Sequence, residues 1–534
     1  MAVERKVDAI VVGAGHNGLV AAGYLARAGL RVTVLERRSI VGGACVTEEI
    51  APGFRVSRTS YVTSLLLPEV VRDFKMKQRG YRVYVADPGG FYVYPDGRYL
   101  LTYADREKRH REFSKFSRGD ARAYERFEED LSRIRPFIDD ILRTTPPGFP
   151  PRGMGDYWDY LKLARKVRAL DRKDLRHLME LMMASPAEYL DRRFESTEIK
   201  AMIGANCTVG TSVGVMTPGA AYVILHHAVG GVDGVAGDWG RVHGGMGSIT
   251  RILAEACREA GVEIRTGAEV DRVLVRNGRA QGVVLGNGDE LSSRIVVSNA
   301  DPKRTFLKMV EPQHLEPDFL EDIRRFKIQG SSIKVNCALS ELPNWTCLPG
   351  QDPKAPHQIA GFYIVPSMEY IERAFDDMKY GRPSRKPLID GNIASTSDDS
   401  LAPEGKHVMS LFVQYGPYHL KEGTWPEIRE QVGDTIIDTI AEYAPNIKNA
   451  IIARDVLSPW DLEQEYGLTE GNIFHGEITP DQLFFMRPAP GWANYRCPLK
   501  GLYLCGSGAH PGGGVMGGPG LNASREILRD LRGR

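Results

Sequence analysis

The chain has 534 residues, of which 42% are hydrophobic and 26% charged, and its formal net charge is +1. This length is too great for a single hydrophobic core, so we expect two or more domains. The near-neutral charge provides no global field that would attract nucleic acid, and no stretch predicts a transmembrane span. A strand pattern begins at Val7, so we expect no targeting peptide and a cytoplasmic protein.

The cysteine pattern argues against two kinds of site. None of the cysteines belongs to a C-x-x-C or C-x-x-x-x-C pair, so we expect neither a disulfide-reductase centre nor a metal site. Scattered, unpaired cysteines are typical of a reducing compartment. They are Cys45, Cys207, Cys257, Cys337, Cys347, Cys497 and Cys505.

The N-terminal segment has the order strand, glycine turn, helix, strand and acid that is typical of dinucleotide binding. Gly13 permits a tight turn, Gly15 lets the backbone approach a pyrophosphate, and Gly18 lets the helix pack against the strand. The helix N-terminus presents free N–H groups to the phosphates. Glu36, which follows the second strand, is placed to accept hydrogen bonds from an adenosine ribose. The alternative, a glycine turn in a plain βαβ unit, leaves this complete order unexplained.

Three later segments have patterns that fit the same nucleotide-binding unit. A second glycine pair, Gly42 and Gly43, leads into the polar residues 53–61. Residues 244–300 predict a helix, two hairpin turns and another parallel strand. Residues 501–518 predict a strand and then a glycine-rich loop, before the last helix.

The glycine-rich loop at 506–518 predicts the second half of a cofactor site. A large planar ligand that runs over backbone needs glycines, because side chains would collide with it. The loop is not a second dinucleotide motif, since no strand and acid follow its helix. We therefore predict FAD, with the adenosine at the N-terminal motif and the flavin at this loop. Cys505 lies in the predicted strand, so we expect non-covalent FAD; a flexible glycine linker is the alternative.

These segments resemble the FAD-dependent amine oxidase and phytoene desaturase superfamily. The run from Gly506 to Gly514 looks like the flavin-facing motif of bacterial-type phytoene desaturases. The resemblance runs along the chain and is closest to the branch named pyridine nucleotide-disulfide oxidoreductase domain-containing protein 2, although paired redox cysteines are missing. It rests on residues 11–24, 41–50, 57–66 and 471–496.

The resemblance implies an α/β fold with the two-domain architecture of p-hydroxybenzoate hydroxylase and the amine oxidases. A Rossmann-like FAD-binding domain then carries an inserted α+β substrate domain. We expect the FAD-binding domain in residues 1–85, 240–310 and 470–534, and the substrate-binding or cap domain in residues 86–239 and 311–469.

Periodicity predicts the elements of the two insertions. In the first, which is expected to be helical, apolar residues recur at i, i+3, i+4 and i+7 and predict one buried helix face. The second is expected to mix strands at 332–339 and 408–415 with a helix at 425–443. The residues of the predicted buried face are Leu175, Leu178, Met179 and Met182.

The motifs and the resemblance together suggest the cofactor-binding residues. The superfamily often has an arginine after the glycine pair, where this chain has Ala44, and Arg37, Arg38 and Arg58 are candidate substitutes. The expected set is Gly13, Gly15, His16, Asn17, Gly18, Glu36, Arg37, Gly42, Gly43, Ala44, Arg58, Val270, Gly506, Ser507, Gly514, Val515 and Met516.

Residues 162–176 form a basic stretch that contains seven cationic and two acidic residues. Leucines and a valine interleave with these charges. One interpretation is a helix that contacts an anionic membrane peripherally and admits an apolar substrate from it. The alternative is a solvated helix face.

Catalysis is expected to combine the flavin with a proton acceptor. Flavin N5 can take a hydride, and desaturation also removes a proton from the neighbouring carbon. The candidates lie at or near glycine-rich turns, where a structural role is the alternative for each. His510 is expected to be a loop residue rather than a base. The candidates are His226, His227, His243, His475, Glu477 and Asp481.

Three functions are compatible with these residues. The first is an FAD-dependent oxidoreductase that desaturates, saturates or isomerises an apolar polyene, isoprenoid or acyl substrate. The second is a flavin amine oxidase that uses O₂ and needs an aromatic pair, for which Tyr495, Trp492 and Phe474 are available. The third is a flavoprotein with mainly an interaction or regulatory role. Anaerobic flavin reduction by a substrate would separate the enzymes from the third function, and hydrogen peroxide would mark the oxidase.

Overall fold

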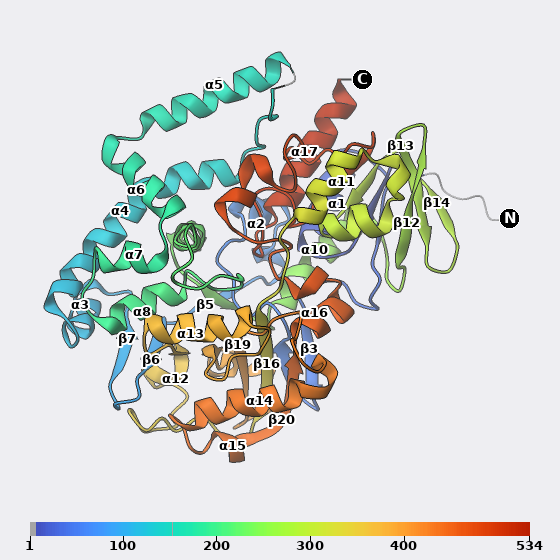
Figure 1. Ribbon diagram of the computed structural model, residues 1–534. Coiled ribbons are helices and arrows are strands. Elements are labelled where there is room, and N and C mark those ends of the chain that lie inside the picture. Colours follow the sequence, from blue (N-terminus) through green and yellow to red (C-terminus); the bar gives the residue numbers. More distant parts are fainter. Residues whose placement is uncertain (1–6, 152, 534) are drawn as a thin grey trace.

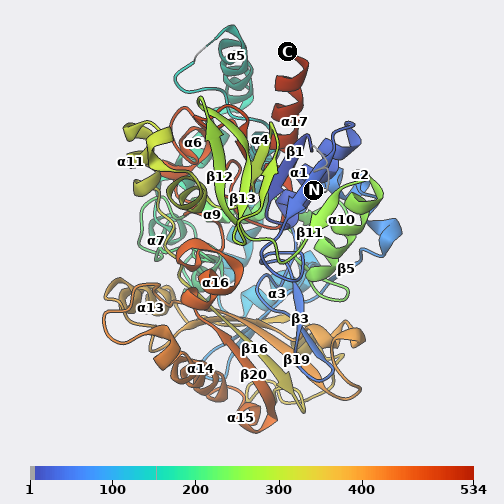
Figure 2. The ribbon, with the colours of Figure 1, turned by 90° about the vertical axis from the view of Figure 1, so that its right-hand side faces the viewer.

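A parallel sheet and a mixed sheet occupy opposite parts of the molecule, and helices surround them (Figures 1 and 2). The computed structural model describes residues 7–151 and 153–533. Within these residues, no helix is long and apolar enough to cross a membrane. The chain starts in the parallel sheet and returns to it near the C-terminus, so distant segments meet there.

The parallel sheet is built from widely separated segments. In spatial order its strands are β11 (Glu263–Arg265), β2 (Val32–Leu35), β1 (Ala9–Val12), β15 (Val296–Ser298) and β21 (Leu502–Leu504). All residues of β1 are apolar and buried, as expected for a parallel strand covered on both faces. The same core includes residues of helices α1 (His16–Arg27), α10 (Gly247–Glu259) and α17 (Gly518–Arg532), and of the antiparallel strands β12 (Val270–Arg276), β13 (Arg279–Leu285) and β14 (Glu290–Ser292).

The mixed sheet is antiparallel except at one pair of strands. In spatial order its strands are β20 (Ile451–Leu457), β16 (Ser332–Leu339), β19 (His407–Gln414), β18 (Leu388–Asn392), β17 (Gly361–Ile364), β6 (Gly90–Val93) and β7 (Tyr99–Thr102), of which β17 and β6 are parallel. In β16, Ile333, Val335 and Cys337 join the core beneath α14 (Trp425–Ala441), so Lys334 and Asn336 lie on the other face. The strands predicted at 332–339 and 408–415 and the helix at 425–443 are confirmed by β16, β19 and α14.

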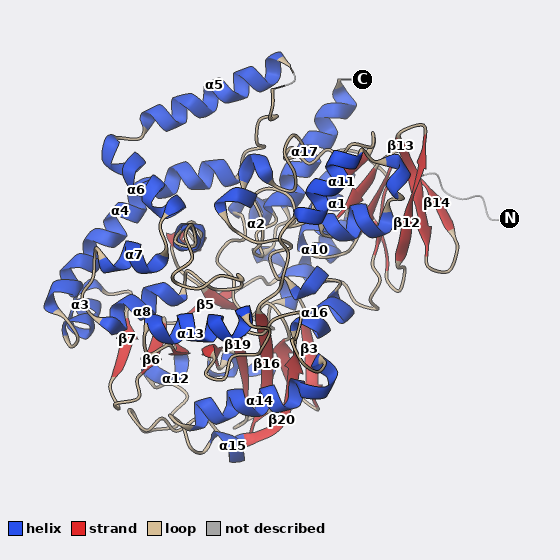
Figure 3. Ribbon diagram, viewed as in Figure 1, coloured by secondary structure: helices blue, strands red, loops and turns tan. Residues whose placement is uncertain are grey.

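The first insertion forms the helical lobe on the left of Figure 3. Its helices are α3 (Arg106–Ser114), α4 (Arg118–Leu142), α5 (Met154–Ala169), α6 (Arg172–Met183), α7 (Pro186–Asp191), α8 (Thr197–Ala205) and α9 (Tyr222–Ala228). Most of these helices share one apolar core, which also reaches α13 (Met368–Lys379). Helix α5 is the exception, because none of its residues is buried.

The buried face of α6 agrees only in part with the predicted one: Leu178 and Met182 pack against the core of the lobe, whereas the prediction was wrong for Leu175 and Met179. Leu175 and Met179 are 39% and 42% exposed, whereas Asp174 and His177 are buried. Asp174 accepts a hydrogen bond from Arg133 Nε of α4 at 2.8 Å. The inward face of α6 therefore combines these two polar residues with Leu178, Leu181 and Met182, and lies to one side of the predicted stripe.

Shorter elements connect the two sheets. The hairpin β3 (Thr47–Ala51) and β4 (Phe54–Ser57) packs Phe54 and Val56 against the mixed sheet. Helix α11 (Pro317–Arg325) packs Phe319 into the core of the parallel sheet. The predicted domain boundaries stay predictions, since neighbouring segments share cores across them. The remaining elements are α2 (Pro68–Asp73), η1 (Lys77–Arg79), β5 (Val83–Val85), β8 (Gly231–Val232), β9 (Val235–Ala236), β10 (Gly240–Val242), the π-helix η2 (Arg304–Met309), η3 (Pro312–His314), α12 (Pro356–Ile359), η4 (Ala394–Thr396), η5 (Asp399–Leu401), α15 (Ile447–Ala450), α16 (Pro459–Tyr466), η6 (Thr469–Gly471), η7 (Pro480–Gln482) and η8 (Phe484–Met486).

Candidate cofactor and active site

A continuous cavity of about 580 Å³ lies between the parallel and mixed sheets. This volume is within the usual range of cofactor and substrate sites. Glu36 follows β2, Lys334 and Phe412 lie on β16 and β19, and Val515 precedes α17, so distant parts of the chain share its wall. The predicted cofactor residues that line it are Gly13, Gly15, His16, Asn17, Glu36, Arg37, Gly42, Gly43, Ala44, Val270, Ser507, Gly514 and Val515.

The glycine turn after β1 leaves almost no space for side chains. A Cβ at Gly15 would lie 2.8 Å from the side-chain nitrogen of Asn299, and one at Gly18 would lie 2.2 Å from the carbonyl oxygen of Gly13. Gly13 has φ +94°, which favours glycine. Gly15 therefore presents bare backbone to the cavity, and Gly18 allows α1 to pack against the turn.

The carboxylate of Glu36 is held by main-chain donors on two sides. It accepts hydrogen bonds from the backbone N–H of Ala14 at 2.8 Å and of Arg38 at 2.9 Å. The residue is buried and lines the cavity at the end of β2. A carboxylate fixed in this way can accept hydrogen bonds from the hydroxyl groups of a ribose.

Side chains of α1 reach the C-terminal glycine loop directly. Asn17 Nδ2 donates to Ser507 Oγ at 3.1 Å, and His16 Nε2 lies 3.2 Å from the carbonyl oxygen of Gly514. The Oδ1 atom of Asn17 is buried without a partner. The glycine turn after β1 and the C-terminal glycine loop, almost 500 residues apart, thus form one wall of the cavity. In this wall, Asn17 Oδ1 is a hydrogen-bond acceptor without a protein partner.

Three residues expected to contact the cofactor, Gly18, Gly506 and Met516, are not part of the cavity wall. A Cβ at Gly506 would lie 2.5 Å from the carbonyl oxygen of Asn299, so this glycine lets the loop approach the end of β15. Met516 is buried, and its carbonyl accepts the N–H of Leu67 at 3.0 Å. These contacts support a packing role for Gly506 and Met516, as the sequence predicts for Gly18. The position expected for Cys505 is corrected: it is buried directly after β21 rather than inside it.

Arg487 joins the C-terminal loop to the preceding segment. It is fully buried, and its guanidinium donates only to main-chain carbonyls: Ser507 at 2.8 Å, Phe474 at 2.9 Å, Glu477 at 3.0 Å and Gly476 at 3.2 Å. Burial lowers the pKa of Arg487 to about 10, which leaves it charged at neutral pH. These bonds fix the segment around Phe474 relative to the loop after β21, and both segments line the cavity.

Arg58 belongs to an ion-pair network instead of the cavity wall. Its guanidinium donates to Asp455 at 3.0 Å and to Glu465 at 2.5 Å. These carboxylates raise the pKa of Arg58 against the opposing effect of burial. The cofactor contact expected for Arg58 therefore has no geometric support.

The structure adds Arg304 of η2 to the cationic residues of the cavity. Arg304 lines the wall, and its Nε atom is buried without a partner. A Cβ at Gly467 would lie 3.6 Å from Arg304 Cζ and 3.7 Å from Arg37 Cζ, so the two guanidinium groups flank this glycine. Burial and the charge of Arg304 lower the pKa of Arg37. The pair offers a cationic wall beside Glu36 that sequence spacing did not reveal.

His227 and His475 line the cavity, which is where a catalytic proton acceptor has to lie. His227 Nδ1 lies 3.1 Å from the carbonyl oxygen of Asn206, and desolvation lowers its pKa to about 4. His475 has φ +56°, and its Nδ1 atom is buried without a partner. Burial lowers the pKa of His475 too, so both imidazoles are neutral at pH 7.

The other two histidine candidates, His226 and His243, lie outside the cavity wall, as does the loop residue His510. His226 is buried with Nε2 at 3.2 Å from the carbonyl oxygen of Gly513, and burial lowers its pKa to about 3. His243 Nδ1 lies 3.1 Å from the hydroxyl of Tyr84 and 3.2 Å from Asp398 Oδ1. His510 Nε2 lies 3.0 Å from a carbonyl oxygen of α4. Each has the structural partners that the alternative interpretation predicts.

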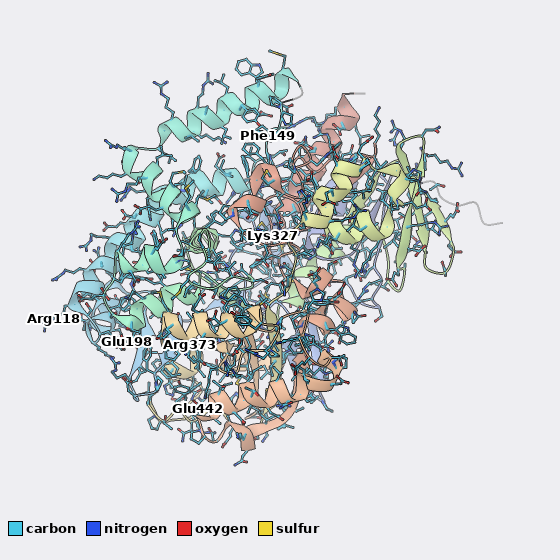
Figure 4. All side chains as sticks on the ribbon, viewed as in Figure 1. Arg118, Phe149, Glu198, Lys327, Arg373 and Glu442 are labelled. Carbon is cyan, nitrogen blue, oxygen red and sulfur yellow. The ribbon has the colours of Figure 1, made fainter. Side chains whose placement is uncertain are left out.

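The acidic candidates are also bound away from the cavity wall. Glu477 accepts hydrogen bonds from the N–H of Ser212 at 3.1 Å and from Asn472 Nδ2 at 3.0 Å, and burial raises its pKa to about 7. Asp481 accepts from Lys327 Nζ at 2.7 Å, and Lys327 is labelled in Figure 4. Both carboxylates are thus bound to protein groups outside the cavity wall.

Lys334 is a cavity residue absent from the predicted set. It is buried, with Nζ donating to Asn336 Oδ1 at 3.0 Å and to Ser410 Oγ, and lying 5.1 Å from the centre of the Tyr61 ring. Burial lowers the pKa of Lys334 to about 7, so both of its protonation states are populated at neutral pH. The available signal was the alternation of polar and apolar residues in β16, which puts Lys334 on the face opposite Ile333.

A tyrosine and an aspartate complete the surroundings of Lys334. The hydroxyl of Tyr61 donates to Asp390 Oδ2 at 2.6 Å, and the Tyr61 ring stacks on Phe412 with centroids 5.7 Å apart. Burial raises the pKa of Asp390 to about 6. Lys334 and Tyr61 line the cavity, with Asp390 behind them, and titratable groups that burial shifts toward neutrality at such a site are typical of sites that move protons.

Comparison with known proteins identifies the family. The family model described as "Flavin containing amine oxidoreductase" matches residues 18–528, which is most of the chain. The chain belongs to this family. It is 41% identical to pyridine nucleotide-disulfide oxidoreductase domain-containing protein 2 of Mus musculus, over 99% of this chain and 94% of the mouse protein.

Further members of the superfamily align along nearly the whole chain. The phytoene desaturase (neurosporene-forming) of Cereibacter sphaeroides is 26% identical, over 98% of this chain and 94% of the desaturase. The solved structure of wild-type putrescine oxidase bound to putrescine has a TM-score of 0.60 and 16% identity, over 99% of each chain. The superfamily resemblance and the α/β fold class with two-domain architecture are thereby confirmed.

The flavin amine oxidoreductase family implies an FAD cofactor, and the cavity fits one. The bare backbone at Gly15, the fixed carboxylate of Glu36 and the unused polar atoms of Asn17 and Arg304 suit a dinucleotide. The chain is therefore an FAD-dependent oxidoreductase, as the sequence predicts. When bound, FAD supplies the electron transfer. In the described part of the chain, no cluster of His, Cys, Asp and Glu is arranged to hold a metal ion.

Proposed function

We propose that this oxidoreductase moves hydride between FAD and an apolar polyene, isoprenoid or acyl substrate, in a desaturation, saturation or isomerisation. The apolar part of the cavity wall is the observation that carries the proposal, because it can hold an uncharged chain by burying it. The likeness to a phytoene desaturase supports the same substrate class. The apolar wall residues include Val62, Leu65, Val209, Trp239, Phe412, Ile473 and Phe474.

In this proposal, Lys334 is the group that accepts or returns a substrate proton. Its amine lines the cavity, and Asn336 and Ser410 orient it from behind. A pKa of about 7 makes the neutral amine available at neutral pH. His475 is the second candidate, because its neutral imidazole also lines the cavity with an unused nitrogen. The surrounding apolar wall excludes water from the reacting carbon atoms.

Amine oxidation is the alternative that the cavity supports less. Two of the aromatic residues considered for an amine-guiding pair, Tyr495 and Trp492, are outside the cavity wall; the hydroxyl of Tyr495 donates to the carbonyl of His510 at 2.9 Å. Tyr61 and Phe412 do line it, but they stack on each other and leave no gap for a substrate between them.

The proposal includes a place for the enzyme in the cell. All seven cysteines are free, which supports a reducing compartment such as the cytoplasm. An apolar substrate resides in membranes, so we also propose peripheral contact with an anionic membrane through residues 162–176.

The test is an anaerobic titration of the FAD-loaded protein with polyenes, isoprenoids, fatty acyl esters and amines. We expect members of the first three classes to bleach the long-wavelength flavin absorption, and their products to differ by two hydrogens or by double-bond position. Val209→Asp should weaken this response about ten-fold or more, because it places a charge in the apolar wall. Val235→Asp is the matched control, since Val235 is 57% exposed and outside the cavity wall.

Other outcomes would contradict the proposal. Bleaching by amines alone, with hydrogen peroxide formed on admission of air, would establish the amine oxidase. If no class reduces the flavin and a reduced flavin returns no electrons to any of them, the interaction role would replace both enzymes.

A further inference from the structure

We infer that the outward face of α5 is an interfacial surface that docks the enzyme onto an anionic lipid bilayer. Helix α5 lies at the edge of the molecule in both views, and none of its residues is buried (Figures 1 and 2). The inference deepens, and rests on, the membrane contact proposed for residues 162–176. It moves the centre of that contact to the first turns of α5, which precede the basic stretch.

The outward face of α5 begins with large apolar side chains. Met154, Tyr157, Trp158 and Leu161 follow the i, i+3, i+4, i+7 spacing and therefore share one face of the helix. They are 75%, 59%, 56% and 43% exposed. Tryptophan and tyrosine favour the depth at which lipid headgroups meet acyl chains, because one end of each ring system is polar. A helix that displays such a face without a partner is typical of interfacial binding.

The acids of α5 lie on the opposite face. Asp156 and Asp159 are half-buried, and they project from the helix on the side away from Met154 and Trp158. Asp156 accepts the N–H of Gly148 at 3.1 Å. The outward face of α5, all of whose residues the structure describes, therefore carries no acid that an anionic membrane would repel.

The same face continues into cations. Arg165 and Arg168 follow Leu161 on the outward side, and Arg172 and Lys173 begin α6. None of these four forms an ion pair within the described part of the chain, whereas Lys166, on the inward side, pairs with Asp140 of α4. Unpaired cations beside exposed aromatic rings complement phospholipid headgroups, at about a five-fold gain in membrane binding for each cation.

The inward side of α5 is attached to the body by a few contacts. The ring of Phe485 lies 5.8 Å from Tyr160 of α5 and 5.8 Å from Phe149, which Figure 4 labels beneath the helix. These contacts and the Lys166 ion pair fix the helix with its apolar stripe outward. The stripe contains four partly exposed side chains, too small an area for the roughly 800 Å² per partner of a stable dimer. A bilayer needs no matching protein surface, so it is the occupant that this face fits.

The experiment is flotation of the FAD-loaded protein with vesicles of phosphatidylcholine, with and without about one-third phosphatidylserine. We expect binding to the anionic vesicles, lowered about ten-fold or more by Tyr157→Ser with Trp158→Ser and by Arg165→Glu with Arg168→Glu. The controls make related changes elsewhere: Tyr380→Ser, at a residue 66% exposed, and Arg324→Glu with Arg325→Glu on α11, where both arginines pair with Glu321. Controls should bind like the unchanged protein.

The outcome can be separated from that of the proposed function. Anaerobic flavin reduction by a detergent-dispersed substrate does not depend on vesicles, so the α5 variants should keep it and lose only reduction by substrate held in anionic vesicles. Absence of wild-type binding to anionic vesicles would overturn the inference, as would equal losses in the α5 variants and the controls. A shift from dimer to monomer in the α5 variants, without vesicle binding, would assign the face to a second copy instead.

Discussion

At neutral pH the side chain of Lys334 divides between its protonated and neutral forms, because burial lowers its pKa to about 7. Only the neutral amine accepts a proton, and its fraction rises with pH. We therefore expect the rate of substrate-dependent flavin reduction to rise as pH increases through about 7 and to level off above it. Lys334→Met should lower this rate by about 10²–10⁴-fold, the usual contribution of a positioned acid–base group.

Stopped-flow absorption of the FAD-loaded protein between pH 5.5 and pH 9, on the order of half-unit steps, measures this profile. Lys334→Arg keeps a cation but cannot release its proton, so its rate should be low and free of the step near pH 7. Lys327→Met is the control, because Lys327 is exposed and paired with Asp481. A step that persists in Lys334→Arg would assign the titration to another group.

Residues differ in how far their sequence context reveals their role. Glu36 is predictable, because the end of the second strand in a dinucleotide unit fixes where its carboxylate points. The ion pairs of Arg58 are not predictable, since its position near the glycine pair says nothing about Asp455 and Glu465, which bind it from about 400 residues away. Lys334 was missed for the same reason: only the meeting of the two sheets puts the polar face of β16 into the cavity.

At the scale of elements, Arg487 ties the segment around Phe474 to the loop after β21. Replacing it with Met leaves main-chain carbonyls buried without a donor, so Arg487→Met should lower the free energy of unfolding by about 3 kcal/mol or more. The loop also forms the cavity wall, so FAD should bind more weakly. Denaturant unfolding and FAD titration measure the two effects.

A matched arginine separates this effect from the loss of any cation. Arg454 on β20 pairs at the surface with Glu430 and Asp434, so Arg454→Met should cost less than about 1 kcal/mol and leave FAD affinity unchanged. Arg487→Lys should fall between the wild type and Arg487→Met, because an ammonium cannot reach carbonyls on both segments. If Arg487→Met and Arg454→Met lowered the free energy of unfolding equally, the conclusion that Arg487 joins the two segments would be wrong.

Elements are predictable where a local pattern decides them. β16, β19 and α14 follow from alternation and helical periodicity, which need no partner to be recognised. In α6, by contrast, the periodicity places Leu178 and Met182 correctly against the core, but buried Asp174 and His177 take the inward positions that it assigns to Leu175 and Met179. The partly polar inward stripe has no sequence signal, since its partners belong to other helices.

At the scale of the whole molecule, segments from both ends of the chain and from both large sheets surround one cavity. The parallel sheet could be predicted from its motifs, whereas the meeting of β16 and β19 with the glycine loop could not, because it depends on how two cores pack. The hairpin β3–β4 packs against the mixed sheet, although it follows β2 of the parallel sheet. Helix α11 packs into the core of the parallel sheet, although it precedes β16 of the mixed sheet. A ligand in the cavity therefore contacts structure that the sequence presents as separate domains.

FAD should stabilise both sheets together. A ligand at 100 times its Kd adds about 2.7 kcal/mol to the free energy of unfolding. We expect FAD to raise the Tm and to slow hydrogen exchange both in the loop 506–515 and in β16, because its site is lined by both. Gly15→Ala should abolish much of this gain, since its Cβ fills the backbone cradle 2.8 Å from the Asn299 side chain. Gly155→Ala is the control, because its Cβ meets open space. Slower exchange confined to the parallel sheet would show that FAD leaves the mixed sheet thermodynamically independent, and the cavity would then bind its cofactor from one side alone.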